Sequence, residues 1–145
     1  MRFLPRAAID LAIHFEGLRL DVYLDPVGIP TIGYGHVCKA DHPPITKDQA
    51  LEYLRQDMGI AGGAVVAALP GVDMDFLTDP RLAALADFTF NLGGTRFRAS
   101  TLRRKVLDHD VVGAADEFPK WRMAGGKILA GLVKRRAAER GLWLG

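Results

Sequence analysis

Three residues that could form a general acid/base site stand close together in the N-terminal third of the chain: Glu16, Asp25 and Thr31. Glu16 ends a stretch of helical hydrophobic periodicity, and Asp25 opens a turn nine residues later. Two carboxyl groups that are brought together in different surroundings suit acid/base chemistry on a glycosidic bond. The hydroxyl of Thr31 is a third candidate, because it could hold a water molecule or a sugar group.

The helix that positions Glu16 is predicted to begin at Pro5 and to end at Gly17, two residue types that favour these helix ends. Between them, hydrophobic residues recur at helical spacing, for example Ala8, Leu11 and Phe15. Glu16 then lies beside the hydrophobic stripe, where desolvation favours the protonated form that a general acid needs. A solvated glutamate at the helix end is the alternative.

Asp25 belongs to a predicted β-hairpin whose first strand is Leu20–Leu24. The run Asp-Pro-Val-Gly at 25–28 is typical of a type I turn, so a purely structural role for Asp25 is the alternative to a catalytic one. The run 31–36 alternates in the way of a single strand. One predicted face of that strand carries Thr31, Gly33 and Gly35, where bare backbone would lie open to a ligand. His36, on the other face, is expected to pair with an acidic residue.

The rest of the chain is predicted to be helical. A capping box at 46–49 begins a helix that reaches about residue 69, and a loop at 71–80 precedes a helix at 81–92 that is hydrophobic nearly all round. Further helices are expected from Ser100, from Asp110 and over 132–142. In the last one, Lys134, Arg135 and Arg136 are expected to form a solvated basic face, although one of them could reach the acidic site. The fold class is therefore α+β and mainly helical, with one helix, one small antiparallel sheet and about five further helices.

Composition indicates an ordinary soluble globular domain. The 145 residues are 49% hydrophobic and 25% charged, which excludes disorder, and the net charge of +2 suits any polyanionic partner without selecting one. The single cysteine, Cys38, cannot form an internal disulfide and is interpreted as inert. His36 and His42 lack further ligands at a metal-binding spacing, so neither a metal nor a cofactor is expected. The N-terminus is too polar and too short for a membrane span or a signal peptide.

The segment from Glu16 to His36 resembles a known signature. It fits E-G-x-R-x-x-x-Y-x-D followed by G-x-x-T-I-G-Y-G-H, which is similar to the phage-type lysozymes (endolysins) of glycoside hydrolase family twenty-four. The runs DFTFNLG at 87–93, STL at 100–102, GAADEFPKW at 113–121 and GGKILAGLVKRRAAE at 125–139 also look similar to that family and follow in its order. The resemblance therefore extends over almost the whole chain.

The resemblance implies a lysozyme-like two-lobe fold in a single domain, 1–145. The N-terminal lobe would span about 15–60, and a helical C-terminal lobe, with the N-terminal helix packed on it, about 70–145. It also implies a muramidase that cleaves the β-1,4 bond between N-acetylmuramic acid and N-acetylglucosamine of peptidoglycan, with inversion. Glu16 would be the proton donor, Asp25 the second carboxylate, and Thr31 a residue that positions water or stabilises the reacting sugar. The substrate groove would include four further residues: Val37, Phe90, Asn91 and Thr101.

Two departures from the family pattern bear on partners and substrate fit. Many relatives carry an N-terminal membrane-tethering or export segment that this sequence does not show. We therefore expect a monomer made in the host bacterial cytoplasm, without stable membrane insertion, which reaches the cell wall through a pore made by another phage protein. The loop Gly71–Pro80 matches no family motif.

Two other functions remain as alternatives at this stage. A lytic transglycosylase needs only one glutamate, and the presence of Asp25 and Thr31 argues against it. A catalytically dead module that binds cell wall or nucleic acid is supported only by the basic C-terminal helices. The intact acidic site argues against that module, so no nucleic-acid partner is expected.

Overall fold

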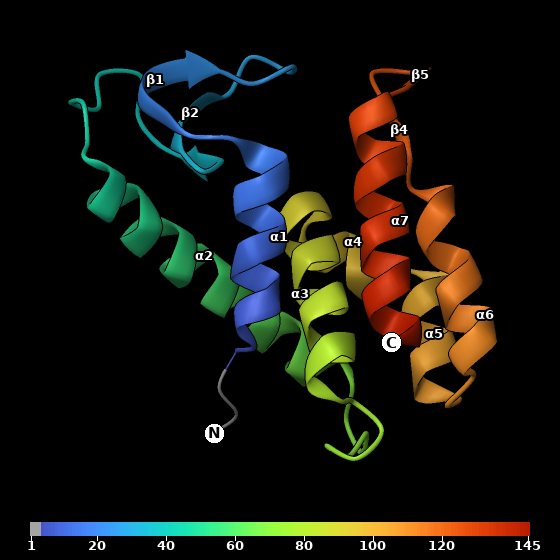
Figure 1. Ribbon diagram of the computed structural model, residues 1–145. Coiled ribbons are helices and arrows are strands. Elements are labelled where there is room, and N and C mark those ends of the chain that lie inside the picture. Colours follow the sequence, from blue (N-terminus) through green and yellow to red (C-terminus); the bar gives the residue numbers. More distant parts are fainter. Residues whose placement is uncertain (1–3) are drawn as a thin grey trace.

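The computed structural model describes residues 4–145, which form seven α-helices, one 3₁₀ turn and two small antiparallel sheets (Figure 1). This confirms the predicted α+β, mainly helical fold class. The elements in chain order are α1 (Arg6–Glu16), β1 (Arg19–Leu24), β2 (Pro30–Gly33), β3 (His36–Val37), α2 (Lys47–Ala68), α3 (Asp79–Leu92), α4 (Gly94–Arg98), α5 (Thr101–Leu107), α6 (Val111–Glu117), η1 (Phe118–Lys120), β4 (Met123–Ala124), β5 (Lys127–Ile128) and α7 (Ala130–Leu144).

Helix α3 lies at the centre of the molecule and packs against α1, α2, α4 and α7 (Figure 1). Its residues are divided between two buried hydrophobic clusters. Ala83 and Ala86 belong to the cluster of α1, the sheet and the first half of α2, whereas Leu85 and Phe88 belong to the cluster of the C-terminal helices. A helix between two cores must be hydrophobic on both sides, which explains the pattern seen in its sequence.

Helix α2 links the two clusters. Thr46 and Gln49 form the predicted capping box, in which the Gln49 N–H donates to Thr46 Oγ1 and the Thr46 N–H donates to Gln49 Oε1. The helix continues to Ala68 without interruption at its three glycines. It buries Leu54 and Met58 in the first cluster and Val65 in the second. The lobe boundaries at about 15–60 and 70–145 stay a prediction.

The three-stranded sheet has the order β1-β2-β3 with antiparallel pairing, and it corrects the prediction of one continuous strand at 31–36. Strand β2 ends at Gly33, and a turn at Tyr34 and Gly35 leads back into β3. Both glycines have positive φ values, +68° and +76°, which an extended strand does not contain. They therefore share no face, and the predicted bare strand floor does not exist.

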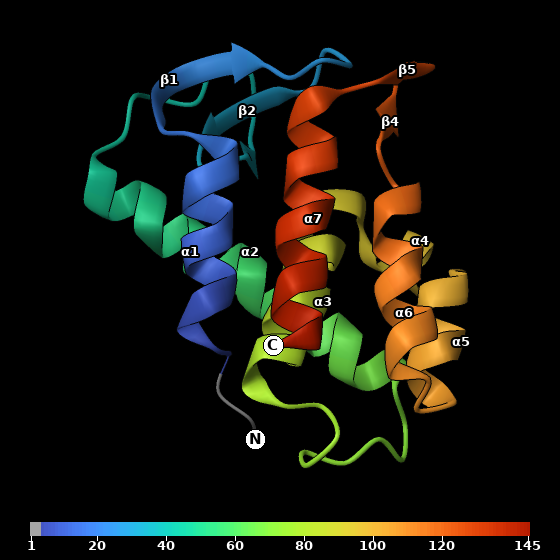
Figure 2. The same ribbon diagram turned by 45° about the vertical axis from the view of Figure 1, so that its right-hand side comes forward.

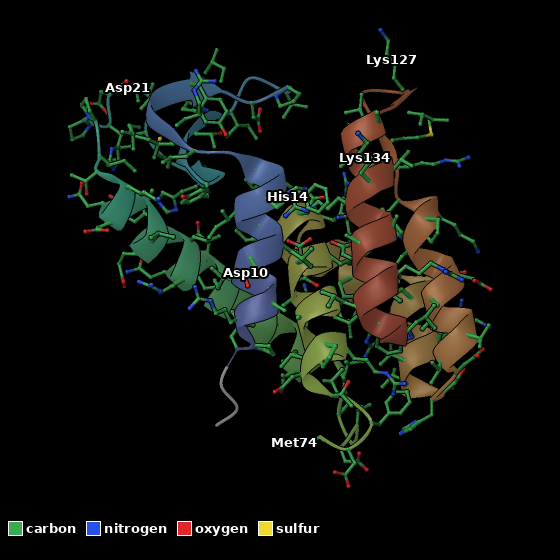
Figure 3. The ribbon with its side chains drawn as sticks, viewed as in Figure 1. Asp10, His14, Asp21, Met74, Lys127 and Lys134 are labelled. Atoms are coloured by element: carbon green, nitrogen blue, oxygen red, sulfur yellow. The ribbon has the colours of Figure 1, made fainter. Side chains whose placement is uncertain are left out.

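The C-terminal half contains elements that were not predicted. The five-residue helix α4 follows Gly93 directly, and β4 and β5 form a hairpin where the sequence indicated only a loop. Helix α7 begins at Ala130, two residues before the predicted start. The loop at 71–78 lies at the opposite end of the molecule from the three-stranded sheet, and Met74 points away from the body (Figures 1 and 3).

Candidate active site

Glu16 is the last residue of α1, and it lies where the helix meets the three-stranded sheet. The next residue, Gly17, has a φ of +69° that turns the chain toward β1. In both ribbon views this end of α1 and the N-terminal half of α7 lie at the same end of the molecule as the sheet (Figures 1 and 2). The Glu16 side chain is 20% exposed, so its carboxylate is only partly open to solvent.

An arginine from the far end of the chain holds the Glu16 carboxylate. Arg135 Nη1, on α7, donates to Glu16 Oε2 at 2.5 Å, although 119 residues separate the two. Arg135 is itself anchored by Asp87 on α3, because its Nε and Nη2 donate to the two carboxylate oxygens at 2.9 and 2.7 Å. A paired guanidinium–carboxylate contact of this kind fixes orientation as well as charge.

The contacts of Arg135 correct the prediction of a solvated basic face. Lys134 is exposed on α7 (Figure 3), but Arg135 is only 4% exposed and Arg136 is fully buried. Successive residues point about 100° apart on a helix, so three adjacent basic residues cannot share one face. The alternative that one of them reaches the acidic site is confirmed for Arg135. Burial lowers the pKa of Arg135, but hydrogen bonds and charge from Asp87 and Glu16 raise it above its usual value.

Gly35 forms the floor under the Glu16 carboxylate. A Cβ atom at this position would lie 2.8 Å from Glu16 Oε1. With a φ of +76°, the position also disfavours any residue with a side chain. The two glycines of the sequence motif therefore serve different purposes, because Gly33 packs against Ala50 and Ile45 instead.

Asp25 organises the β1–β2 turn, as the sequence indicated. Its Oδ1 accepts hydrogen bonds from the N–H groups of Val27 at 2.9 Å and Ile29 at 2.8 Å, and its C=O accepts one from Gly28. These bonds fix the side chain with one oxygen facing the turn. Because Oδ2 takes no part in them, the turn role leaves one carboxylate oxygen for chemistry.

Thr31 differs from its prediction. It is 4% exposed, and its Oγ1 donates a hydrogen bond to the Ile29 carbonyl at 2.8 Å, so it does not project over an open floor. Since the hydroxyl proton is already used, Oγ1 can only accept further hydrogen bonds.

Tyr23 connects the three predicted residues, and the sequence reasoning did not identify it. It is the cross-strand partner of Thr31. Burial raises the pKa of Tyr23, and the negative charges of Glu16 and Asp25 raise it further against the opposing effect of Arg19. Both carboxylates therefore act on the same phenol.

A groove of about 300 Å³ extends from Gly35 between the sheet, α2 and the end of α3. It is lined by Val37 and Phe90, two of the four predicted groove residues. Asn91 and Thr101 are not among its lining residues, and Thr101 Oγ1 accepts a hydrogen bond from Arg104 instead. At the groove wall, His36 Nδ1 contacts Asp57 Oδ2 at 2.7 Å, which confirms the acidic partner predicted for His36.

Residues 4–145 hold no group of three or more His, Cys, Asp or Glu side chains that is placed to bind a metal ion. None of the helices in this part of the chain is long and apolar enough to cross a membrane. Burial raises the pKa of the Cys38 thiol, which disfavours the reactive thiolate.

Comparison with known proteins identifies the family. Residues 13–139 match the phage lysozyme family. The chain belongs to the phage lysozyme family. Among its relatives, the endolysin of Acyrthosiphon pisum secondary endosymbiont phage 1 is 40% identical over 89% of both chains. The endolysin of Bacillus phage PZA is 37% identical over 97% of this chain, but this chain spans only 54% of that relative's length.

Solved structures of the family agree over the whole chain. The muramidase domain of SpmX from Asticaccaulis excentricus matches with a TM-score of 0.88 at 32% identity, covering 100% of this chain and 99% of that domain. A mutant of P22 lysozyme matches with a TM-score of 0.83 at 32% identity, covering 100% of both chains. The family and the fold that the sequence motifs predicted are thereby confirmed.

Proposed function

We propose that this chain is a lysozyme, a peptidoglycan hydrolase that cleaves the β-1,4 bond between N-acetylmuramic acid and N-acetylglucosamine and so lyses bacterial cell walls. The observation that carries the proposal is the pair of carboxylates held in fixed positions, Glu16 by Arg135 and Asp25 by the β1–β2 turn. Membership of a family whose named members are endolysins supports the substrate.

In this mechanism Glu16 protonates the glycosidic oxygen of the leaving sugar. Arg135 fixes one oxygen of the Glu16 carboxyl, and Gly35 leaves room for it, so the group has a defined position. A well-positioned acid typically contributes about 10²–10⁴-fold to the rate. The wall of the adjacent groove, with Val37 and Phe90, suits the sugar rings on one side of the bond.

Asp25 and Thr31 act on the other side of the reacting sugar. The free Asp25 Oδ2 directs a water molecule or stabilises the positive charge that develops on the ring. Thr31 Oγ1, which donates to the Ile29 carbonyl, accepts a hydrogen bond from that water and helps to orient it. A water that attacks from the side opposite the leaving group inverts the anomeric carbon.

The test is the loss of turbidity of purified peptidoglycan with Glu16→Gln. We expect a rate at least about 100-fold below wild type, and a smaller loss for Asp25→Asn, because no other group replaces the proton donor. Glu52→Gln is the matched control, since Glu52 is an exposed residue of α2 that pairs with the equally exposed Arg55. Clearing by Glu16→Gln at near wild-type rate, with a native circular dichroism spectrum, contradicts the assignment.

The reaction products test the bond and the stereochemistry. Mass spectrometry of the muropeptides distinguishes a hydrolase, which adds water, from a lytic transglycosylase, which leaves an anhydro ring. The anomeric form of fresh product, followed by NMR, distinguishes inversion from retention. Three finer predictions accompany the proposal. Asn91 and Thr101 contribute to sugar binding, which binding assays with alanine variants test. The protein is a monomer, which light scattering tests, and it is released through a phage pore, which lysis assays with and without a pore protein test.

A further inference from the structure

The β4–β5 hairpin has no part in the proposed mechanism, and it is exposed along its whole length. All residues from 122 to 131 are exposed. Each strand has only two residues, and the turn between them contains Gly125 and Gly126 with φ values of +57° and +76°. In both ribbon views the hairpin projects beyond the start of α7 (Figures 1 and 2). Because an isolated two-stranded hairpin is marginally stable in water, packing alone does not explain its side chains.

Large hydrophobic side chains gather at this end of the molecule. On the hairpin and the first turn of α7, Met123 is 55% exposed, Ile128 58% and Val133 43%. In the part of the chain that the structure describes, nine of the fourteen exposed large hydrophobic residues lie on the three-stranded sheet with its turns or between positions 123 and 133: Leu20, Leu24, Val27, Ile29, Val37, Met123, Ile128, Leu129 and Val133. An exposed hydrophobic surface of this kind is typical of an interaction site.

The hairpin also belongs to a purely basic segment. The stretch 118–138 contains six lysines and arginines and no acidic residue. Arg135 and Arg136 are buried, and Lys120 pairs with Glu117. The other three are exposed and form no ion pair within residues 4–145: Arg122, Lys127 and Lys134. Lys127 points away from the body at the extreme end of the molecule, and Asp21 lies on the opposite side of that end (Figure 3).

A shallow hollow at the base of the hairpin combines the two properties. It has a volume of about 330 Å³ and is lined by Pro119, Lys120, Arg122 and Met123. The guanidinium of Arg122 has the fork of donors that matches a phosphate group. The hollow therefore suits a phosphate that is attached to a hydrophobic molecule.

We propose that the β4–β5 hairpin is a peripheral contact site for membranes that contain anionic phospholipids. Met123, Ile128 and Leu129 enter the boundary between headgroups and acyl chains, while the three exposed cations meet the headgroup phosphates. The contact is peripheral, because only the tip of a hairpin takes part. It holds the enzyme at the membrane side of the cell wall, next to its substrate.

The shape and position of the hairpin favour a membrane over other partners. A stable protein–protein interface buries about 1,200–2,000 Å², which a projecting hairpin with two-residue strands does not provide. A sugar chain in the groove beside Glu16 is not the occupant either, since no residue from 122 to 131 lines that groove. A convex tip with cations around hydrophobic side chains instead matches a flat, negatively charged lipid surface.

Sedimentation with lipid vesicles tests the proposal. The protein should bind vesicles made of equal parts phosphatidylglycerol and phosphatidylcholine, should not bind pure phosphatidylcholine, and should be released by salt. Each cation at an anionic surface strengthens binding about 5-fold, so Arg122→Gln/Lys127→Gln should bind about 30-fold more weakly. Lys47→Gln/Arg96→Gln is the matched control, because both residues are exposed and lie on α2 and α4. Equal binding of the two double variants overturns the proposal.

Fluorescence quenching tests whether the hairpin enters the lipid. Ile128→Trp should be quenched by anionic vesicles whose acyl chains carry bromine, beyond the quenching of the wild type with its two natural tryptophans. Val112→Trp is the control, since Val112 on α6 is 65% exposed, similar to Ile128 at 58%. If Ile128→Trp is quenched no more than Val112→Trp, the hairpin does not enter the membrane and the proposal is wrong.

Catalysis and membrane contact are measured separately. Arg122→Gln/Lys127→Gln should clear purified peptidoglycan, which contains no lipid, at the wild-type rate. If this variant clears more slowly but binds vesicles as the wild type does, the hairpin contacts the cell wall instead, and the proposal is overturned. Glu16→Gln should bind vesicles like the wild type, so a failure of the proposed function is distinguished from a failure of this inference.

Discussion

Replacing Arg135 with methionine removes the connection between α1, α3 and α7. Asp87 is fully buried and accepts two of the three hydrogen bonds that Arg135 donates. Removing one partner of a buried ion pair leaves an uncompensated charge and costs about 3–5 kcal/mol in the free energy of unfolding. Since small domains are stable by only about 5–15 kcal/mol, this variant should lose a large part of its stability, with a melting temperature roughly 10–15 °C below wild type.

The effect should depend on pH. In the wild type the pKa of Asp87 is lowered in the folded state, so its contribution is present above the unfolded pKa and is lost as pH falls through the folded pKa. In Arg135→Met, burial without the guanidinium raises the pKa of Asp87, and each unit of pH above about 4 then favours the unfolded chain. The stability difference between the two proteins should therefore widen from about pH 4 to pH 7.

Urea denaturation followed by circular dichroism at several pH values measures this difference. Lys134→Met is the matched control, because Lys134 is the preceding residue of α7 and is exposed (Figure 3). It should change stability by less than about 0.5 kcal/mol at any pH. If Arg135→Met costs no more than the control at neutral pH, or if its cost is the same at every pH, the reasoning about the buried pair is refuted.

Two further variants probe the glycine and histidine of the sequence motif. Gly35→Ala should reduce the clearing rate by at least about 10-fold by displacing the Glu16 carboxylate, while Gly71→Ala, with a similar φ of +79° and no atom within 4 Å, should cost only about 1 kcal/mol of backbone strain. Equal activity of these two variants would contradict the close-contact explanation. Asp57→Ala removes the partner of His36 and should cost about 1 kcal/mol, measured by thermal unfolding; an unchanged melting temperature would show that the bond adds nothing.

The features that could be predicted are those set by residues near each other in sequence. The end of α1 at Gly17 and the capping box of Thr46 and Gln49 depend on residues within one helical turn. The Asp25 turn likewise follows from four consecutive residues. The prediction of one continuous strand at 31–36 is wrong for a related reason. Alternation of residue types alone does not reveal a positive φ at Gly33 and Gly35.

Arg135 could not be assigned from local pattern, because its partners are 48 and 119 residues away. A run of three basic residues is typical of a solvated surface, and two of the three are buried. One signal was available in the sequence. Asp87 lies in a helix that is hydrophobic nearly all round, and a buried carboxylate requires a cationic partner from another element. That requirement points to the basic residues of α7 without selecting one of them.

The position of the ionic network, in which Arg135 pairs with Asp87 and Arg136 with Glu139, argues against stability as its main purpose. Replacing buried ion pairs with hydrophobic residues of similar volume often leaves the folding stability unchanged or increases it. Stability alone therefore does not explain why the core contains Asp87, Arg135, Arg136 and Glu139. The network instead runs from the interior between α3 and α7 to Glu16, the one member that is partly exposed. A catalytic acid needs a fixed position. Arg135 supplies it, because two of its hydrogen bonds go to Asp87 while a third holds Glu16. We therefore interpret the pair of Asp87 and Arg135 as the support of the candidate active site.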